Sequence, residues 1–325
     1  MTRVAVIDVG TVTARLAVAD VEEGRVIRMA RQSTIVNLGE GVDKTGVLRE
    51  DACLRLLACV DHYLGSIREA GSPVVCCTLT SAARDARNSQ DLLDQLVARG
   101  LVAQVIPGKV EGSLTFLGVA QDFAQTRLLV ADNGGGSTEF ALGTFGADQT
   151  LDLDFVQSID VGCRRVTEKF LQRNDPPAPE DVANAHAFAA EAFAPIATRI
   201  ANGQAPERLV VTGGTSTTLV ALEKELVPYD SSKVHLATLS VEAVEQQERR
   251  LAAITAADRA NLPGIQPKRA PVILGGVIAV REVMRAAGVN ELTVSESDLL
   301  FGLSITVAAA ADGTPSPVGW RPDLR

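Results

Sequence analysis

The stretch RVAVIDVGTVTARL, residues 3–16, is repeated in outline by RLLVADNGGGSTEF, residues 127–140. At an offset of 124 positions both copies carry the pattern Asp-x-Gly, once at Asp8 and once at Asp132. Each copy runs from an apolar strand pattern through an acid and a glycine into small hydroxyl residues, and then into a second strand pattern. Two such turns that face each other would hold a phosphate chain and its metal, so the duplication predicts two related domains.

The size and charge of the chain set the class of protein. A chain of 325 residues is expected to form about two domains. Apolar residues make up 46% and charged residues 22%, a globular composition. Aromatic residues make up only 4% and the formal net charge is −9, which argues against binding of a nucleic-acid polymer or an anionic membrane.

Histidine and cysteine usage narrows the chemistry. The three histidines have no candidate ligand near them in sequence, so a zinc site or a Ser-His-Asp triad is poorly supported. The five cysteines have no metal-ligand spacing, and Cys76 and Cys77 sit in an apolar run, which favours core thiols in a reducing compartment. Met1 leads straight into a strand pattern with no signal-peptide core, so we expect a cytoplasmic protein without a membrane segment.

Strand and helix patterns alternate along the chain and predict an α/β fold with mixed sheets. The expected domains are 1–125 and 126–311, with the last helix able to pack back on the first domain, followed by a loosely docked or disordered tail, 312–325. We expect ligands in a cleft between the domains, at the strand ends. The expected strands are 3–9, 13–20, 24–31, 73–79, 101–106, 127–131, 138–143, 150–159, 208–212 and 291–294. The expected helices are 49–70, 89–98, 110–123, 162–172, one ending near 200, one opening after 212, 240–253, 270–287 and 298–311.

The second turn carries the strongest functional signal. Gly134, Gly135 and Gly136 let backbone N–H groups approach an anion without interference from a Cβ, and Ser137 and Thr138 add hydroxyl donors. The acids that bracket this loop, Asp132 and Glu139, are hard oxygen ligands of the kind that Mg²⁺ prefers. A flexible hairpin turn with solvated acids is the alternative.

Two further loops are weaker candidates for phosphate binding. The first turn offers Gly10, Thr11 and Thr13, and gains weight only from the duplication. The loop that contains Gly213, Gly214 and Thr215 follows a strand and opens a helix, where backbone N–H groups favour anions. A simple tight turn is the alternative for this third loop.

Two charged residues precede the second turn. Glu111 falls in the first turn of an expected helix, where an acid is also favoured by the helix dipole alone. Arg84 follows a core strand, a position that would aim it at the same cleft; an ordinary surface ion pair with Asp85 or a neighbour is the alternative.

Taken together, these segments resemble the exopolyphosphatase and guanosine pentaphosphate phosphatase (Ppx/GppA) family, in the short two-domain form, within the actin-like ATPase superfamily. The resemblance covers roughly residues 3 to 310. It rests on DVGTVTARL (8–16), TSAARDARN (80–88), PGKVEGSLTFLG (107–118), DNGGGSTE (132–139), VGCRRVTE (161–168), TGGTST (212–217) and RAPVIL (269–274).

The resemblance implies two actin-like domains of the ribonuclease H-like type and hydrolysis of terminal phosphoanhydride bonds. The substrate would be inorganic polyphosphate or guanosine pentaphosphate, with Mg²⁺ or another divalent cation as cofactor. A homodimer is one possible assembly. If the substrate is polyphosphate, the missing C-terminal helical extension of longer members suggests weaker retention of very long chains and hence a preference for short ones. Glu111 would be the catalytic base that positions and deprotonates water, and Arg84 would contact phosphate. The metal-associated acids would be Asp8, Asp132 and Glu139, and the phosphate loops Gly10 to Thr13 and Gly134 to Thr138.

The chain departs from the family pattern near the expected catalytic residues. Val110 stands in place of an acid beside Glu111, Gly112 in place of alanine, and Ser113 in place of a frequent arginine. Val12 stands where asparagine is common. Asn133 replaces an apolar residue, and Pro271 a frequent aspartate. These departures motivate a second hypothesis, a non-catalytic sensor that binds polyphosphate or nucleotide. An actin-like sugar or acid kinase is disfavoured because no Asp is placed as its acceptor base.

Overall fold

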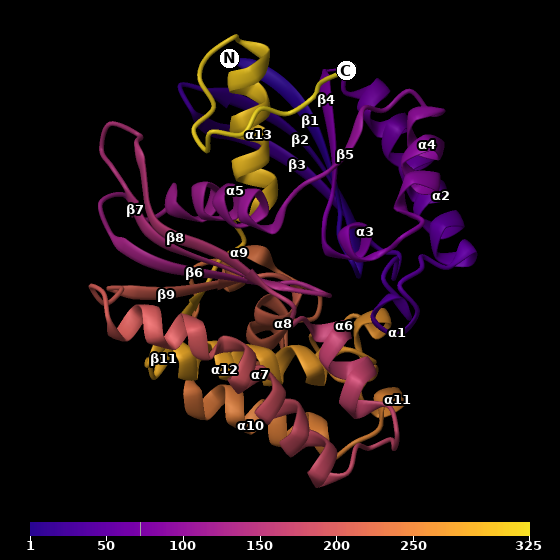
Figure 1. Ribbon diagram of the computed structural model, residues 1–325, viewed down its shortest axis with the longest axis vertical. Helices are drawn as coiled ribbons and strands as arrows, with labels where there is room; N and C mark the ends of the chain where they lie inside the picture. The colour runs from indigo at the N-terminus through magenta and orange to yellow at the C-terminus, as the bar shows by residue number, and fades with distance from the viewer. Residues whose placement is uncertain (72) are drawn as a thin grey trace. The chain divides into compact units, whose positions relative to one another are not determined.

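The computed structural model describes residues 1–71 and 73–325, and it confirms the α/β fold (Figure 1). The chain separates into two compact units, each built on one sheet with helices against it. The first unit comprises Met1–Ala124, Phe145–Asp152 and Asp298–Arg325, and the second Gln125–Thr144 and Leu153–Ser297. Within the described residues no helix is both long and apolar enough to cross a bilayer.

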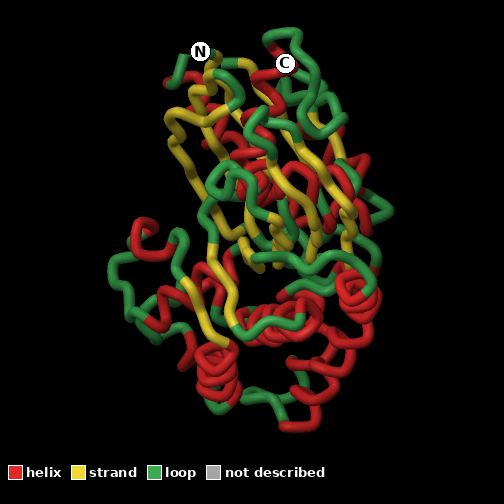
Figure 2. Tube along the Cα trace, turned by 90° about the vertical axis from the view of Figure 1, so that its left-hand side faces the viewer, coloured by secondary structure: helices red, strands yellow, loops and turns green. Residues whose placement is uncertain are grey.

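The first unit contains a five-stranded sheet in the order β3-β2-β1-β4-β5. The first three strands pair antiparallel, while β4 and β5 continue the sheet parallel to β1. Figure 2 shows these strands running alongside one another. The strands are β1 (Thr2–Val9), β2 (Thr13–Glu22), β3 (Arg25–Ile35), β4 (Val74–Leu79) and β5 (Ala103–Val105). The helices are α1 (Val42–Thr45), α2 (Glu50–Glu69), α3 (Ser81–Asp85), α4 (Ser89–Val97), α5 (Gly108–Ala120) and α13 (Leu299–Ala311).

Side-chain alternation along β1 assigns its two faces. Ala5, Ile7 and Val9 join the core cluster that includes the apolar residues of α2. Val4, Val6 and Asp8 therefore point to the opposite face, against which α13 packs. The carboxylate of Asp8 is thus directed toward the end of α13 rather than toward α2.

The last helix, α13, belongs to the first unit. It lies beside α5 and against β1 and β2 (Figure 1). The expected domains left open whether this helix packs back on the first domain, and in the structure it does, because α13 buries its apolar surface on the first sheet. The segment expected to be loosely docked also pairs with that sheet, since Arg325 and Val75 exchange two backbone hydrogen bonds.

The second unit contains a six-stranded sheet in the order β10-β11-β9-β6-β7-β8. Strands β6, β9 and β11 are parallel, and β7 and β10 pair antiparallel with β6 and β11. The strands are β6 (Arg127–Asn133), β7 (Thr138–Phe145), β8 (Leu151–Ile159), β9 (Arg208–Thr212), β10 (Thr238–Ser240) and β11 (Glu291–Val294). The helices are α6 (Cys163–Val166), a π-helical turn (Thr167–Leu171), α7 (Pro179–Ala201), α8 (Gly214–Glu223), α9 (Ser231–Val234), α10 (Val241–Ala252), α11 (Ala256–Arg259), a 3₁₀ turn (Pro267–Arg269) and α12 (Ile273–Ala287).

The core of the second unit lies between this sheet and the helices α7, α8, α10 and α12. Phe140 on β7 and Phe193 on α7 meet edge to face in its centre, with ring centroids 5.1 Å apart. The alternation along β6 places Leu129 and Ala131 in this core and Asp132 on the other face. β6 therefore places Asp132 near its carboxyl end, on the face opposite the helices of this core.

Local differences from the sequence-based expectation lie near the strand ends. Residues 80–88, expected as a polar stretch, contain the short helix α3. Strand β3 continues to Ile35 instead of ending near residue 31, because its last residues pair with the start of β2. The expected helix 162–172 divides into α6 and a π-helical turn.

Candidate active site

The two Asp-x-Gly copies share the same turn geometry. In the first unit the N–H of Gly10 donates to the carbonyl of Thr13 at 3.0 Å. In the second unit the N–H of Gly134 donates to the carbonyl of Ser137, also at 3.0 Å. A Cβ on either glycine would lie 3.1 or 3.2 Å from that carbonyl oxygen, so a larger residue would crowd the turn. The repeat in the sequence is therefore also a repeat of backbone hydrogen bonds.

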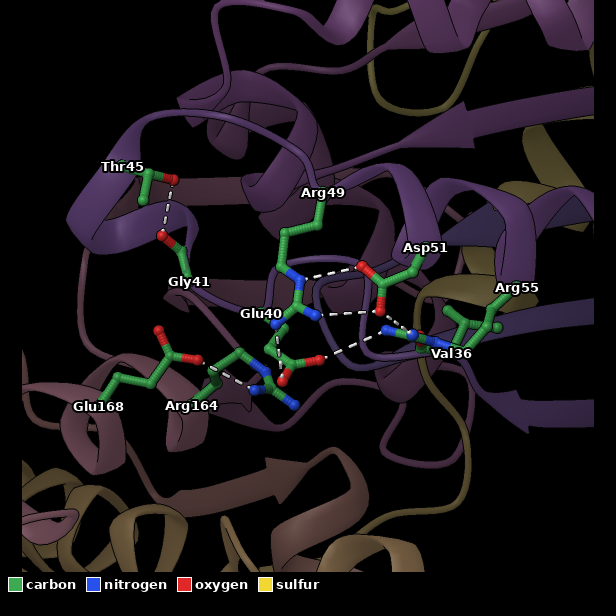
Figure 3. Close-up of polar contacts among 9 residues, drawn as sticks. All are labelled: Val36, Glu40, Gly41, Thr45, Arg49, Asp51, Arg55, Arg164 and Glu168. Carbon is green, nitrogen blue, oxygen red and sulfur yellow. Dashed lines mark hydrogen bonds and ion pairs between the residues drawn. The ribbon is translucent and has the colours of Figure 1, made fainter.

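The first turn is held from outside by the segment after β3. The N–H groups of Val36 and Asn37 both donate to the carbonyl of Val12, and the N–H of Gly39 donates to the carbonyl of Thr11 at 2.8 Å. A Cβ on Gly39 would lie 2.3 Å from the Thr11 side chain, so this approach requires glycine. The segment is itself held by Arg55 of α2, whose Nε donates to Val36 O (Figure 3). Arg55 also belongs to an exposed network of ion pairs.

Asp8 is buried directly before the first turn, and only one of its two carboxylate oxygens is hydrogen-bonded. Its Oδ2 accepts from Nη2 and Nε of Arg15 at 2.6 and 3.0 Å, while Oδ1 is buried without a hydrogen-bond partner. Burial raises the pKa of Asp8, and the guanidinium of Arg15 opposes that rise. Arg15 also reaches Asp298 Oδ2 at 2.5 Å. An unsatisfied carboxylate oxygen in this position is suited to a cation or a donor from a ligand.

Arg84 and Glu111, predicted from separate segments, form an ion pair. Nη1 of Arg84 lies 2.7 Å from Glu111 Oε2 and also donates to the carbonyl of Ile106 at 3.0 Å. Glu111 is only 7% exposed although it lies in the first turn of α5. Stabilisation of a helix N-terminus does not require such burial, and the contacts of Arg84 with Glu111 and Ile106 O hold its guanidinium in place. The guanidinium fixes the carboxylate in one orientation, as a base that must align a water molecule requires.

A second unsatisfied polar atom lies one helical turn before Arg84. Ser81 is buried, and its Oγ has no hydrogen-bond partner. Strands β1 and β4 are parallel neighbours with Val9 beside Leu79, so Ser81 and the first turn emerge at the same edge of the sheet. Sequence reasoning passed over Ser81 because a serine in TSAARDARN has no distinguishing pattern.

In the second unit the two predicted metal-associated acids face each other. Asp132 on β6 and Glu139 on β7 are cross-strand partners, and both are buried. Glu139 Oε1 accepts from Ser158 Oγ at 2.6 Å. Like charges directly opposite each other on a sheet are destabilising unless a cation or a donor lies between them. This pair is therefore suited to hold a positive charge.

The glycine loop of the second unit is anchored by the segment that follows β8. The N–H of Cys163 donates to Gly134 O and that of Arg164 to Gly135 O, at 3.0 and 2.9 Å. Nε of Arg165 donates to Gly136 O at 2.7 Å. The side chain of Arg164 pairs with Glu168 at 3.0 Å (Figure 3). The loop carbonyls are occupied by these donors.

The third loop lies beside the second within the same unit. Gly213 adopts a φ of +105°, and a Cβ there would lie 2.6 Å from Asn133 O and 3.2 Å from Asp132 Oδ1. The guanidinium of Arg269 covers Gly214 so closely that a Cβ would lie 2.0 Å from Nη1. Thr215 is buried at the start of α8. Gly213, Gly214 and Thr215 thus flank Asp132, which sequence order alone did not reveal.

The structure groups the predicted residues by unit. One edge of the first sheet carries Asp8, Gly10, Thr11, Thr13, Arg84 and Glu111. One edge of the second sheet carries Asp132, Gly134 to Glu139 and Gly213 to Thr215. Their association in a single cleft stays a prediction. Sequence reasoning did not select Arg15, although the duplication aligns it with Glu139, and it had no signal for Asp298.

The acids fit a divalent cation that is completed by its ligand. Among residues 1–71 and 73–325 no group of three or more His, Cys, Asp or Glu side chains is placed to hold a metal by itself. Mg²⁺ commonly takes one or two carboxylates and fills its remaining positions with phosphate oxygens and water. The unsatisfied oxygen of Asp8 in the first unit matches such a partial donor set, and so, separately, does the facing pair Asp132 and Glu139 in the second unit.

Comparison with known proteins gives one consistent result. The Ppx/GppA phosphatase family matches residues 17–305. The chain is 35% identical to Exopolyphosphatase 2 of Mycobacterium tuberculosis, covering 95% of this chain and 99% of that protein. It is 28% identical to Exopolyphosphatase 1 of the same organism, covering 96% and 90%. An exopolyphosphatase of Cytophaga hutchinsonii is similar in structure, with a TM-score of 0.84 at 27% identity over 98% of this chain and all of that one. The Aquifex aeolicus family member gives a TM-score of 0.76 at 29% identity, over 94% and 96%. The chain belongs to the Ppx/GppA phosphatase family, as its motifs indicated.

Proposed function

We propose that the protein is an exopolyphosphatase that releases phosphate from the ends of inorganic polyphosphate. The observation that carries this proposal is the ion pair between Arg84 and the buried Glu111, at the edge of the first sheet where the first turn lies. The family membership and the named exopolyphosphatase relatives support the same class of reaction, hydrolysis of a phosphoanhydride.

The proposed reaction assigns each group one role. Glu111 accepts a proton from water while the water oxygen forms a bond to the terminal phosphorus. The bond from that phosphorus to the bridging oxygen breaks, and the shortened chain leaves with the electron pair. Reactions of this type depend on alignment and on neutralisation of charge more than on covalent chemistry. Arg84 orients Glu111 and contacts the terminal phosphate.

Charge on the phosphate chain would be offset by backbone amides and by a cation. The loops at Gly10 to Thr13, Gly134 to Thr138 and Gly213 to Thr215 would bind phosphate oxygens. Asp8, Asp132 and Glu139 would hold Mg²⁺ or another divalent cation, which neutralises phosphate charge when bound.

A phosphate-release assay tests the proposal. The purified protein is incubated with polyphosphates of several lengths, guanosine pentaphosphate and ATP, each with and without Mg²⁺. We expect Mg²⁺-dependent release from polyphosphate, with ATP a poor substrate. Release from guanosine pentaphosphate alone would overturn the polyphosphate assignment in favour of a nucleotide phosphatase. Binding of polyphosphate without release from any substrate would identify a sensor instead.

A further inference from the structure

A continuous chain of charges links the C-terminal helix to the first turn. Asp298 Oδ2 lies 2.5 Å from Nη1 of Arg15. The opposite side of the same guanidinium, Nη2 and Nε, binds Asp8 Oδ2. Arg15 therefore bridges two acids that are 290 positions apart in the sequence. This arrangement uses one oxygen of Asp8 and leaves Oδ1 without a hydrogen bond.

Asp298 uses its two carboxylate oxygens for separate purposes. Oδ1 accepts from the N–H of Leu300 at 2.9 Å and so caps α13. Oδ2 faces Arg15. Because the two interactions use different oxygens, a substitution can remove one and keep the other.

The backbone of Asp298 is also in contact with the helix that carries Glu111. A Cβ on Gly118 of α5 would lie 2.2 Å from Asp298 O. One turn along the contact, a Cβ on Gly302 of α13 would lie 1.8 Å from Leu114 O. The two helices therefore cross backbone to backbone, with no side chain between them at these points. The start of α13 is fixed both to Asp8, through Arg15, and to α5.

We infer that Asp298 is a positioning residue for the ligand-binding edge of the first unit. Through Arg15, Asp298 holds the carboxylate of Asp8 so that its Oδ1 can contact a ligand. Through its own backbone, Asp298 fixes the position of Asp8 relative to α5, the helix that carries Glu111. The inference rests on the proposed function for the nature of the ligand, a divalent cation with phosphate. Outer partners that orient a metal-binding carboxylate commonly contribute about 10–100-fold to metal affinity or activity.

The variant Asp298→Asn separates positioning from capping. Asparagine caps a helix about as well as aspartate. Its side-chain NH₂, however, only donates hydrogen bonds, so a cap made by its single oxygen leaves no acceptor for Arg15. The matched control is Asp230→Asn, because Asp230 likewise caps a helix, accepting from Ser232 N–H, and pairs with Lys233. Arg15→Lys is the second variant, since it keeps a cation and loses the two-sided fork.

Two measurements decide the inference. The first is Mn²⁺ binding in the presence of inorganic phosphate, followed by the spectroscopic signal of free Mn²⁺. The second is the dependence of kcat and KM on Mg²⁺ concentration. For Asp298→Asn we expect Mn²⁺ to bind about 10–100-fold more weakly and Mg²⁺ activation to need correspondingly more cation. At saturating Mg²⁺ we expect KM for polyphosphate within about threefold of the wild type. We expect Arg15→Lys to act in the same direction and its effect not to add to that of Asp298→Asn.

Several results would overturn the inference. Wild-type Mn²⁺ affinity in Asp298→Asn is one, and an equal loss in Asp230→Asn is another. Failure of the wild type to bind Mn²⁺ with phosphate would also overturn it. If the wild type binds Mn²⁺ but hydrolyses no substrate, the proposed function fails while the comparison of Mn²⁺ affinities still decides the role of Asp298.

Discussion

Arg15 and Glu139 occupy the same position in the two related hairpins, one opposite Asp8 and the other opposite Asp132. The first hairpin thus pairs its acid with a guanidinium, whereas the second pairs its acid with another acid. Two carboxylates at directly opposite positions repel each other, whereas the acid of the first hairpin lies opposite a cation. The related turns have therefore diverged in charge while keeping the same backbone hydrogen bond.

The first prediction concerns the base. Glu111→Gln keeps the shape of the side chain and a hydrogen bond to Arg84 but cannot take a proton from water. We expect kcat for polyphosphate to fall by about 10²–10⁴-fold, measured as phosphate release under saturating substrate. Asp61→Asn is the control, because it removes an exposed carboxylate paired with Arg99 in the same unit and should leave kcat unchanged. Full turnover by Glu111→Gln would assign the base to another group.

Ser81 should show opposite effects on stability and activity. Its buried Oγ lacks a hydrogen bond, so Ser81→Ala removes an unsatisfied group and should leave the melting temperature unchanged or raise it. We expect kcat/KM to fall several-fold, because the hydroxyl lies at the edge that we propose binds the ligand. Ser304→Ala is the control for activity, since Ser304 is equally buried and donates to Leu300 O. A marked loss of stability in Ser81→Ala would show that the hydroxyl has a partner inside the protein.

The crossing of α5 and α13 predicts a glycine requirement. In Gly302→Ala the new methyl would overlap Leu114 O, and we expect the free energy of unfolding to fall by roughly 1–3 kcal/mol or more. Activity should fall as well, because α5 carries Glu111. Gly65→Ala is the matched control in a helix without a close neighbour, and it should gain about 0.5–1 kcal/mol. Chemical denaturation of both variants measures the difference, and similar shifts in the two would contradict the close crossing.

His186 predicts a pH dependence of stability away from the site. Burial lowers the pKa of this imidazole, but hydrogen bonds from its two ring nitrogens to Glu248 and Glu282 outweigh burial and raise the pKa to about 9. Arg281 and Arg285 also face these glutamates. Because the folded pKa lies above the unfolded value near 6.5, the contribution of the charged form is complete below about pH 6.5. It is lost as the pH rises through about 9.

The variant His186→Gln tests this pH dependence. We expect it to lower the free energy of unfolding by roughly 2–4 kcal/mol near pH 6, since it removes the cation that lies between the two buried glutamates and leaves each with only its arginine. The difference from the wild type should shrink between pH 7 and 10. Denaturation curves across that range measure it, with the exposed His62→Gln as control. A difference that stays constant with pH would mean that His186 is not charged in the folded protein.

Local patterns allowed much of the fold to be predicted. The turns at Gly10 and Gly134 follow from glycine after an apolar strand, and Glu111 in a first helical turn follows from the break at Pro107. The ion pair of Arg84 with Glu111 could not be predicted, because it depends on how two strand ends lie side by side. Asp298 was further out of reach, since no periodicity connects it to Arg15, 283 positions earlier.

The place of α13 has a consequence for how the protein is made. Residues 299–311 cover the face of β1 and β2 toward which Asp8 points, yet the ribosome adds them nearly 300 residues after β1. One face of the N-terminal sheet therefore stays uncovered until α13 has been synthesised. That apolar face is a surface on which chaperones would act, and the edge of the first unit that carries Asp8 is complete only once α13 has packed.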